Sequence, residues 1–100
     1  MYRLTTPQHR FNLPLETERI ADLIVSYGQG RTEVLNKRKD NCALEGNTVI
    51  VKLTQQETKL FKPDVPVKIQ IRLLTVDGEA LASCEYLVKC KDVLNDEVLI

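Results

Sequence analysis

The stretch that decides the fold is residues 65–90, VPVKIQIRLLTVDGEALASCEYLVKC. In its first half every odd position from 65 to 73 holds an aliphatic residue, and the even positions include the polar residues Lys68, Gln70 and Arg72. This alternation is typical of a strand with one buried face and one exposed face. Asp77-Gly78 follows, and this dipeptide is the strongest short signal for a hairpin turn. We therefore predict an antiparallel hairpin.

The second arm of this hairpin also alternates, but with smaller residues. Its odd positions include glutamate, serine and lysine, whereas its even positions are apolar. Because one face of a strand follows one parity, we predict that the even positions face the core. The residues predicted to face the core are Ala80, Ala82, Cys84, Tyr86, Val88 and Cys90.

Shorter alternating runs precede the hairpin. The run at 31–38 has no clear parity, so we predict an exposed edge strand there. Together with turn signals about every eight to twelve residues, these runs indicate an all-β chain. We predict an immunoglobulin-like antiparallel β-sandwich of about seven strands, without the Cys-Trp-Cys signature of antibody domains. The runs lie at 9–13, 23–27, 31–38, 42–44 and 48–53.

A polar segment interrupts the strand pattern after Leu53. The residues from Thr54 to Glu57 fit a capping box, in which a hydroxyl and a carboxylate three residues later each bond a free backbone N–H at a helix start. Leu60 and Phe61 would then close this turn against the core, before Pro63 ends it. We therefore predict one short helical turn near 54–61, connecting the two sheets.

Length and charge limit the class of protein. One hundred residues suit a single domain, for which we expect a core at about 7–91 and a C-terminal tail at 92–100. Fourteen basic residues balance fourteen acidic ones, so we expect no nucleic-acid partner. No apolar run is long enough to span a membrane, and the start of the chain has no apolar signal core. We therefore expect no membrane insertion and no secretion by the usual route.

Few residues suggest catalysis or metal binding. His9 is the only histidine, and Cys42, Cys84 and Cys90 lack metal-ligand spacing. On one extended strand Cys84 and Cys90 would lie roughly 20 Å apart, whereas a disulfide needs about 5.5 Å between Cα atoms. A catalytic Cys–His pair would require His9 to lie beside a thiol. We predict reduced thiols, no metal, no cofactor, no small-molecule substrate and no enzymatic activity.

Two regions are candidates for binding a partner. A basic group on the predicted edge strand could attract an acidic protein, although exposed lysines also keep an edge strand from pairing with other chains. Residues 93–100 are half apolar without a predicted place in the core, so they dock either on their own domain or on a partner. Both alternatives stay open. The candidate residues are Arg31, Lys37, Arg38, Lys39, Val93, Leu94, Val98, Leu99 and Ile100.

Two stretches, LEGNTVIVKLTQQETKLFK at 44–62 and VKIQIRLLTVDGEALAS at 67–83, resemble small prophage-encoded proteins of Gram-positive bacteria. They are also similar, more distantly, to the immunoglobulin-like N-terminal module of phage baseplate upper proteins. The shared order is a strand ending in Leu-Thr, a polar turn, a strand with an internal glutamine, an Asp-Gly hairpin and a strand of small residues. The resemblance covers about 5–98, and the matching residues are Leu53, Thr54, Gln70, Asp77, Gly78 and Ser83.

The resemblance implies a virion structural or assembly protein of a tail, baseplate or head appendage. Such a protein is made in the cytoplasm of the bacterial host and is then built into the virion. Its expected partners are other phage structural proteins or copies of itself. Baseplate upper proteins continue past this module into further domains, whereas the sequence of 100 residues does not. We therefore expect a free-standing module here. The alternative is a carbohydrate- or cell-surface-binding module of the same fold, which an exposed cluster of Tyr2, Tyr27 and Tyr86 would favour.

Overall fold

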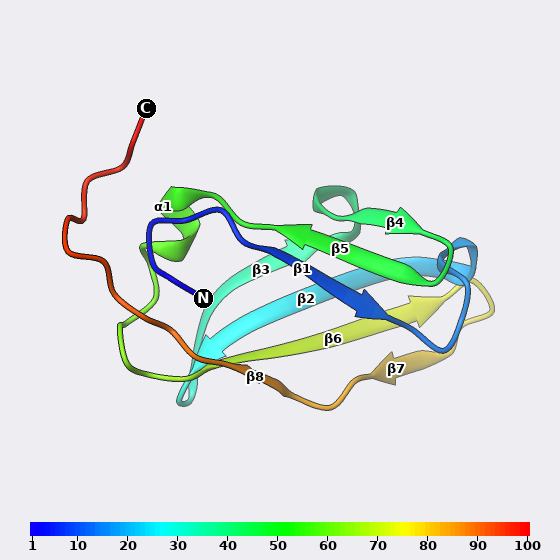
Figure 1. Ribbon diagram of the computed structural model, residues 1–100. Helices are drawn as coiled ribbons and strands as arrows, with labels where there is room; N and C mark the ends of the chain where they lie inside the picture. Colours follow the sequence, from blue (N-terminus) through cyan, green and yellow to red (C-terminus); the bar gives the residue numbers. More distant parts are fainter.

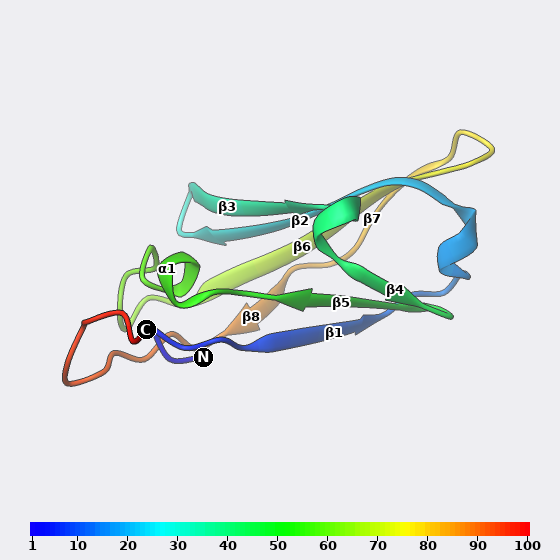
Figure 2. The ribbon, with the colours of Figure 1, turned by 90° about the horizontal axis from the view of Figure 1, so that it is seen from above.

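A computed structural model describes residues 1–100. The chain is mostly β: two antiparallel sheets, of three and five strands, enclose the core between them (Figure 1). Figure 2 shows the two layers from above, with the single α-helix at one end. The prediction of an antiparallel sandwich is therefore confirmed, although the strands number eight rather than about seven.

The smaller sheet has the strand order β1–β5–β4. β1 pairs with β5 from Gln8 opposite Lys52 to Asn12 opposite Thr48, and it forms the predicted edge before Pro14. The strands of this sheet are β1 (Gln8–Asn12), β5 (Thr48–Lys52) and β4 (Ala43–Glu45).

The larger sheet has the order β3–β2–β6, and β7 and β8 share the remaining side of β6. β3 lies at the edge, as its unclear parity predicts. Two short 3-10 helices connect strands: η1 (Thr17–Arg19) lies between β1 and β2, and η2 (Lys39–Asn41) lies between β3 and β4. The strands of this sheet are β2 (Ile20–Gln29), β3 (Thr32–Arg38), β6 (Val67–Thr75), β7 (Ala80–Ala82) and β8 (Tyr86–Val88).

The core is built from the inner faces of both sheets. Alternation along β6 and from Leu23 to Gln29 of β2 buries every second residue, as period-2 patterning requires, and an irregularity between Ile20 and Asp22 lets Ile20 be buried too. The smaller sheet adds aliphatic residues of β5 and one phenylalanine of β1. The largest fully buried side chains are Tyr27, Phe61, Ile20, Leu23, Leu53, Ile69 and Ile71.

The predicted hairpin forms, but its second arm is split by a bulge. Leu81 of β7 lies opposite Leu73, whereas Tyr86 of β8 lies opposite Ile69. The two positions are therefore four residue numbers apart on β6 but five apart on the second arm, so one extra residue is inserted between β7 and β8. An extra residue reverses which parity faces the core.

The predicted parity is therefore wrong for the first part of this arm. Leu81 shares the inner side with its partner on β6, so Ala80 and Ala82 face outward and are exposed. Cys84 lies in the bulge and is exposed, contrary to the prediction that it faces the core. After the bulge the even parity holds, and Cys90 is buried. The turn itself is a three-residue loop in which Gly78 takes the left-handed backbone conformation, φ 91°.

Helix α1 (Gln55–Thr58) carries the predicted capping box. The Thr54 hydroxyl accepts from the Glu57 N–H at 3.1 Å, and the Glu57 carboxylate accepts from the Thr54 N–H at 2.9 Å. Phe61 is buried as predicted. Leu60, which was predicted to pack against the core beside it, is 61% exposed.

The packed region begins earlier than the predicted core at 7–91. Tyr2 forms a parallel β-bridge with Lys91, supported by hydrogen bonds of 2.9 and 2.8 Å between the two segments. Leu4 is buried. Thr58 of α1 holds the same segment, because its hydroxyl bonds both the N–H and the carbonyl of Thr5 at 3.1 and 3.0 Å. These contacts span nearly the whole sequence, so local patterning does not signal them.

Candidate functional site

The only histidine lies between the sheets and bonds a tyrosine rather than a thiol. His9 Nδ1 is 2.8 Å from the hydroxyl of Tyr27, which is fully buried. Burial lowers the pKa of His9, and the charge of the N-terminus lowers it further. Burial likewise raises the pKa of Tyr27, with smaller contributions from Cys42 and Glu57. Both groups are neutral near pH 7, and the pair satisfies two polar groups inside the sandwich.

The three cysteines are free and lie apart in the fold. Burial raises the pKa of Cys42, and the charge of Lys37 opposes part of this effect. Burial also raises the pKa of Cys90. Since the thiolate is the reactive form, both thiols are poor nucleophiles. No three His, Cys, Asp or Glu side chains lie close enough together to hold a metal ion.

The basic residues predicted as one group point in different directions. Lys37 turns toward α1, where its Nζ lies 2.7 Å from a carboxylate oxygen of Glu57, and only 14% of the lysine side chain is exposed. Burial raises the pKa of Glu57, but hydrogen bonds from Lys37 and Thr54 outweigh it and hold the pKa below its usual value. Lys37 therefore ties edge strand β3 to the helix cap.

The other three basic residues lie apart from this ion pair. Arg38 pairs with Asp22 at 3.0 Å on the outer face of the larger sheet. Lys39 donates to the backbone oxygen of Ile20 at 2.8 Å. Arg31 is exposed in the β2–β3 turn and lines an open hollow of about 350 Å³. The structure therefore forms no single basic patch from the four residues.

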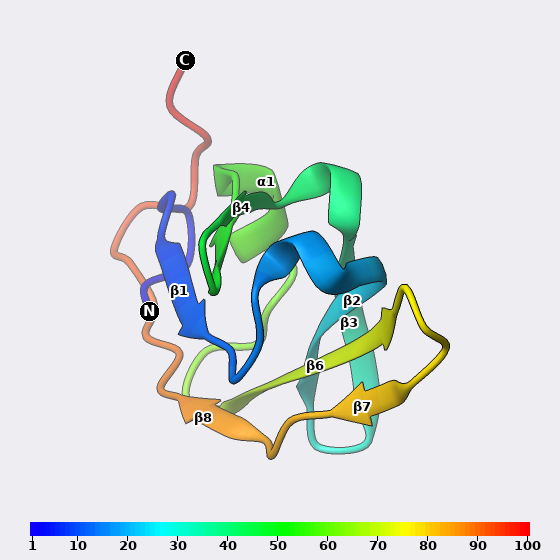
Figure 3. The same ribbon diagram turned by 90° about the vertical axis from the view of Figure 1, so that its right-hand side faces the viewer.

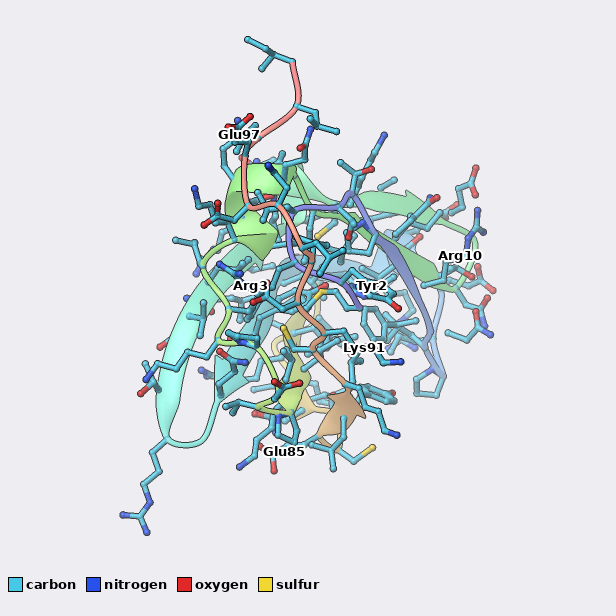
Figure 4. The ribbon with its side chains drawn as sticks, turned by 60° about the vertical axis from the view of Figure 1, so that its left-hand side comes forward. Tyr2, Arg3, Arg10, Glu85, Lys91 and Glu97 are labelled. Carbon is cyan, nitrogen blue, oxygen red and sulfur yellow. The ribbon has the colours of Figure 1, made fainter.

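Arg3 fastens the start of the tail to the body. Its guanidinium donates to Asp92 at 2.6 Å, to the Phe61 carbonyl at 2.8 Å and to the Lys59 carbonyl at 3.1 Å. Hydrogen bonding to Arg3 lowers the pKa of Asp92. Figure 4 shows Arg3 below α1, close to Tyr2. The N-terminal segment, the helix end and residue 92 thus meet at one joint.

Beyond this joint the tail is held to the body by one side chain. The side-chain amide of Gln55 donates to the carbonyl of Leu99 and accepts from its N–H, both at 2.9 Å. The two bonds match the pair that the backbone of an adjacent β-strand would form. The tail lies outside the two layers at the α1 end (Figure 1), and Figure 4 places Glu97 beside α1. Its aliphatic side chains divide into partly buried Val93 and Val98 and exposed Leu94, Leu99 and Ile100.

An apolar groove, here called the lateral cleft, opens between the sheets on the side of β1, β7 and β8. It is lined by residues 12–15, 71, 73, 81–84 and 86, and its volume is about 240 Å³. Pockets for small molecules typically measure about 300–1,000 Å³. Tyr86 packs on Phe11 with ring centroids 5.3 Å apart and joins the two walls. The size and apolar lining suit a few side chains of another polypeptide better than a metabolite.

Ser83 holds the bulge that forms one wall of the lateral cleft. Its N–H donates to the Ile71 carbonyl at 2.8 Å, and its hydroxyl accepts from the Ile71 N–H at 3.0 Å, where a backbone carbonyl would otherwise lie. The side-chain amide of Gln70 donates to the Ser83 carbonyl at 3.1 Å. Gln70 and Ser83 are among the residues that carry the resemblance, and in this structure both shape the strand edge.

Sequence reasoning placed the tail among the candidates but missed the lateral cleft. Its walls come from Leu81, which the β6–β7 register places opposite the inner residue Leu73, and from the chain after β1, which continues past the sheet edge. One signal was available in the sequence, since Leu81 is the only large aliphatic residue between Gly78 and Tyr86. A large residue among alanines marks the side of a strand that is covered.

The three tyrosines do not gather into one exposed cluster. Tyr27 is fully buried, and Tyr86 packs on Phe11. Tyr2 is half exposed, with the ammonium of Lys91 5.8 Å from its ring centroid. The arrangement therefore lacks the aromatic platform that would favour a sugar-binding surface.

The α-helix has four residues, and no helix of the structure has the length and apolar character needed to cross a bilayer. Comparison of the chain with protein-family models, with curated proteins and with solved structures found no match.

Proposed function

We propose that this chain is a non-enzymatic structural module that works through protein–protein contacts, as a component or assembly factor of a phage-type virion. It is made in the cytoplasm of a bacterial host and joins the tail, the baseplate or a head appendage. Its partners are other structural proteins of the particle or further copies of the chain.

One observation carries the contact part of this proposal: the lateral cleft and the tail both expose apolar surface, and the side chains of the tail leucines Leu94 and Leu99 are exposed. Exposed apolar surface of this kind typically marks a protein interface. The polar groups inside the sandwich are all hydrogen-bonded, so they serve the fold.

The phage assignment rests on the resemblance of residues 44–62 and 67–83 described above. The immunoglobulin-like character belongs to this proposal too. Two facing antiparallel sheets agree with it, but the strand order departs from it. In immunoglobulin domains the second strand joins the sheet of the fourth and fifth strands, whereas β2 lies between β3 and β6 in the other sheet.

Mass spectrometry of purified particles tests the proposal. Particles released from the bacterium that encodes the chain are banded by density, and peptides of the chain are quantified in the particle fraction and in the particle-free lysate. We expect the chain to be enriched with known virion proteins, relative to an abundant host cytosolic protein as control. A chain found only in the particle-free fraction, and absent from assembly intermediates, would contradict the proposal.

A further inference from the structure

We propose that the lateral cleft binds the C-terminal segment of a partner protein as an added strand, parallel to β8 and in line with residues 1–3. This inference rests on the proposed function, because it names the chemistry of the partner at one of the contact surfaces. It requires a free strand edge, a cleft for apolar side chains, and a positive charge where the bound segment ends.

The N-terminal segment shows how a strand binds this edge. Tyr2 forms a parallel bridge with Lys91, and the Met1 carbonyl accepts from the Lys91 N–H at 2.8 Å. The Arg3 N–H donates to the Lys91 carbonyl at 2.9 Å. The Met1 side chain packs against the core, whereas Tyr2 is half exposed. Residues 1–3 are therefore a short strand added to the edge that continues β8.

The same edge is free beyond the start of this segment. The Lys89 carbonyl accepts from the Met1 ammonium at 2.7 Å, so it faces away from β6, whereas the Lys89 N–H has no partner. Because backbone groups alternate in direction along a strand, the N–H and the carbonyl of Leu87 face the same way as those of Lys89. β8 pairs only with β6, so these groups are available to an added strand.

The lateral cleft lies beside this free edge. Tyr86 and Cys84 line the cleft, three and five positions before Lys89. Figure 3 shows the start of the chain between β1 and β8, the strands whose edges border the cleft. In an added strand every second side chain would point inward, about 7 Å from the next. A short segment with apolar residues at alternate positions therefore fits a groove of about 240 Å³.

The direction of residues 1–3 decides which end of a partner fits. A segment in line with them also runs parallel to β8, so it comes to an end at Met1. The Met1 ammonium bonds the Lys89 carbonyl with one N–H and has further donors. A carboxylate at that point would form a charge-assisted hydrogen bond with the ammonium. The charge at Met1 is therefore complementary to the C-terminus of a polypeptide.

The tail of the same copy reaches the cleft only in the opposite direction. The path from Asp92 back to Tyr86 covers six residues, or about 20 Å at 3.3 Å per residue. Eight extended residues reach at most about 28 Å, which leaves about 8 Å for a turn and a parallel strand. Inside its own cleft the tail would therefore run antiparallel to β8, with its last residue far from Met1.

The sequence of the tail also disagrees with the lining of the cleft, whichever copy supplies it. In an extended strand Asp96 shares a face with Val98 and Ile100, and Glu97 shares the other face with Leu99. In either register a carboxylate would point into an apolar cleft, where burying an unpaired charge is costly. The occupant is therefore a different protein, whose last residues are apolar at alternate positions.

Binding of a short peptide tests the inference. The probe is VTVTV with fluorescein at its N-terminus and a free carboxylate, and its matched control is the same peptide with an amidated C-terminus. Fluorescence anisotropy with the full chain should show saturable binding of the probe. The amidated peptide should bind about tenfold more weakly, because it loses the charge-assisted bond to Met1. A peptide of residues 93–100 should displace the probe about tenfold less well than unlabelled VTVTV.

Two variants of the chain locate the site. Leu81→Arg places a charge in the cleft, and a Gly-Ser dipeptide added before Met1 covers the edge at Lys89 and moves the ammonium. Each should weaken binding of the probe by about tenfold or more, at a Tm close to that of the intact chain. The matched controls are Leu60→Asp, at an exposed leucine outside the cleft, and Gly-Ser added after Ile100. Both controls should bind the probe like the intact chain.

Cys84 reports the direction of the bound segment in the unmodified chain. It is exposed at the cleft, whereas Cys90 is buried. A VTVTV peptide with a cysteine added at its N-terminal end should form a disulfide with Cys84 under a mild thiol oxidant, as identified by mass spectrometry. The same peptide with the cysteine at its C-terminal end should not, because that end lies at Met1.

Each result decides the inference. The absence of saturable binding, equal binding of the amidated peptide, or binding that Leu81→Arg leaves unchanged overturns it. A disulfide formed faster by the C-terminal cysteine indicates an antiparallel segment and overturns it too. Equal displacement by the peptide of residues 93–100 would assign the cleft to a copy of the chain. Particle incorporation is measured separately, so failed peptide binding with the chain present in particles rejects this partner chemistry and leaves the proposed function standing.

Discussion

Replacing Gln29 with leucine should destabilise the fold more than any change of similar size on the surface. Gln29 is 7% exposed, and its amide makes three hydrogen bonds to the loop between α1 and β6. The amide nitrogen donates to the carbonyls of Lys62 and Val65 at 2.8 and 2.9 Å. The amide oxygen accepts from the Lys62 N–H at 2.8 Å. This one side chain therefore fixes the loop where it enters β6.

The magnitude follows from these three contacts. At about 1 kcal/mol net for each hydrogen bond, their loss costs about 3 kcal/mol of unfolding free energy. The leucine offsets about 1 kcal/mol by burying more apolar surface. A net loss of about 2 kcal/mol should lower Tm by about 8–16 °C in a domain of this size.

Urea unfolding followed by far-ultraviolet circular dichroism measures the difference, with an unchanged m-value showing that the transition is otherwise the same. Gln56→Leu is the matched control, because Gln56 is exposed on α1 and should change stability by less than about 0.5 kcal/mol. A Gln29→Leu loss no larger than that of the control would refute the reasoning.

Three further predictions concern the helix cap, the histidine and the thiols. Thr54→Ala removes half of the capping box and should cost about 1 kcal/mol in chemical unfolding. Burial lowers the pKa of His9, so below pH 6.5 the unfolded chain binds more protons and stability falls as the pH drops; thermal melts between pH 7.5 and 5 should show this slope, and His9→Gln should flatten it. Cys84 should react with a thiol reagent in the native state, whereas Cys42 and Cys90 should react mainly after unfolding.

Controls separate these effects from general damage. Thr6→Ala changes an exposed threonine that caps no helix and should leave stability within about 0.5 kcal/mol. For the histidine, a slope that persists in His9→Gln would assign the pH dependence to other groups. For the thiols, equal native reaction rates at Cys84 and Cys90 would show that the bulge does not expose residue 84 as described.

The sequence predicted those elements that local patterning encodes. The alternation of residues 65–73 and 23–27 marks the inner faces of β6 and β2, because a strand buried on one side must repeat with period 2. The capping box is equally local, since both of its partners lie within four residues. These features lead to a two-layer antiparallel fold without any long-range information.

The bulge and the joints of the tail were not predictable in the same way. Ser83 creates the bulge because its hydroxyl takes the place of a backbone acceptor, and a serine in an alternating run reads as an ordinary exposed residue. Lys37 was assigned to a basic surface group, but its partner Glu57 lies on an element 20 positions later. Arg3 and Asp92 are 89 positions apart. Such side-chain choices depend on which segments the fold brings together.

The most direct test of the account is the molar mass of the chain in solution with and without residues 93–100. Removal after Asp92 keeps the contact with Arg3 and leaves the core intact, so the truncated chain should retain the Tm of the full chain within a few degrees. We predict that the full chain associates with increasing concentration and that the truncated chain stays at the monomer mass. Equal masses for both chains, at equal stability and over the whole concentration range, would contradict the claim that the tail is an association element.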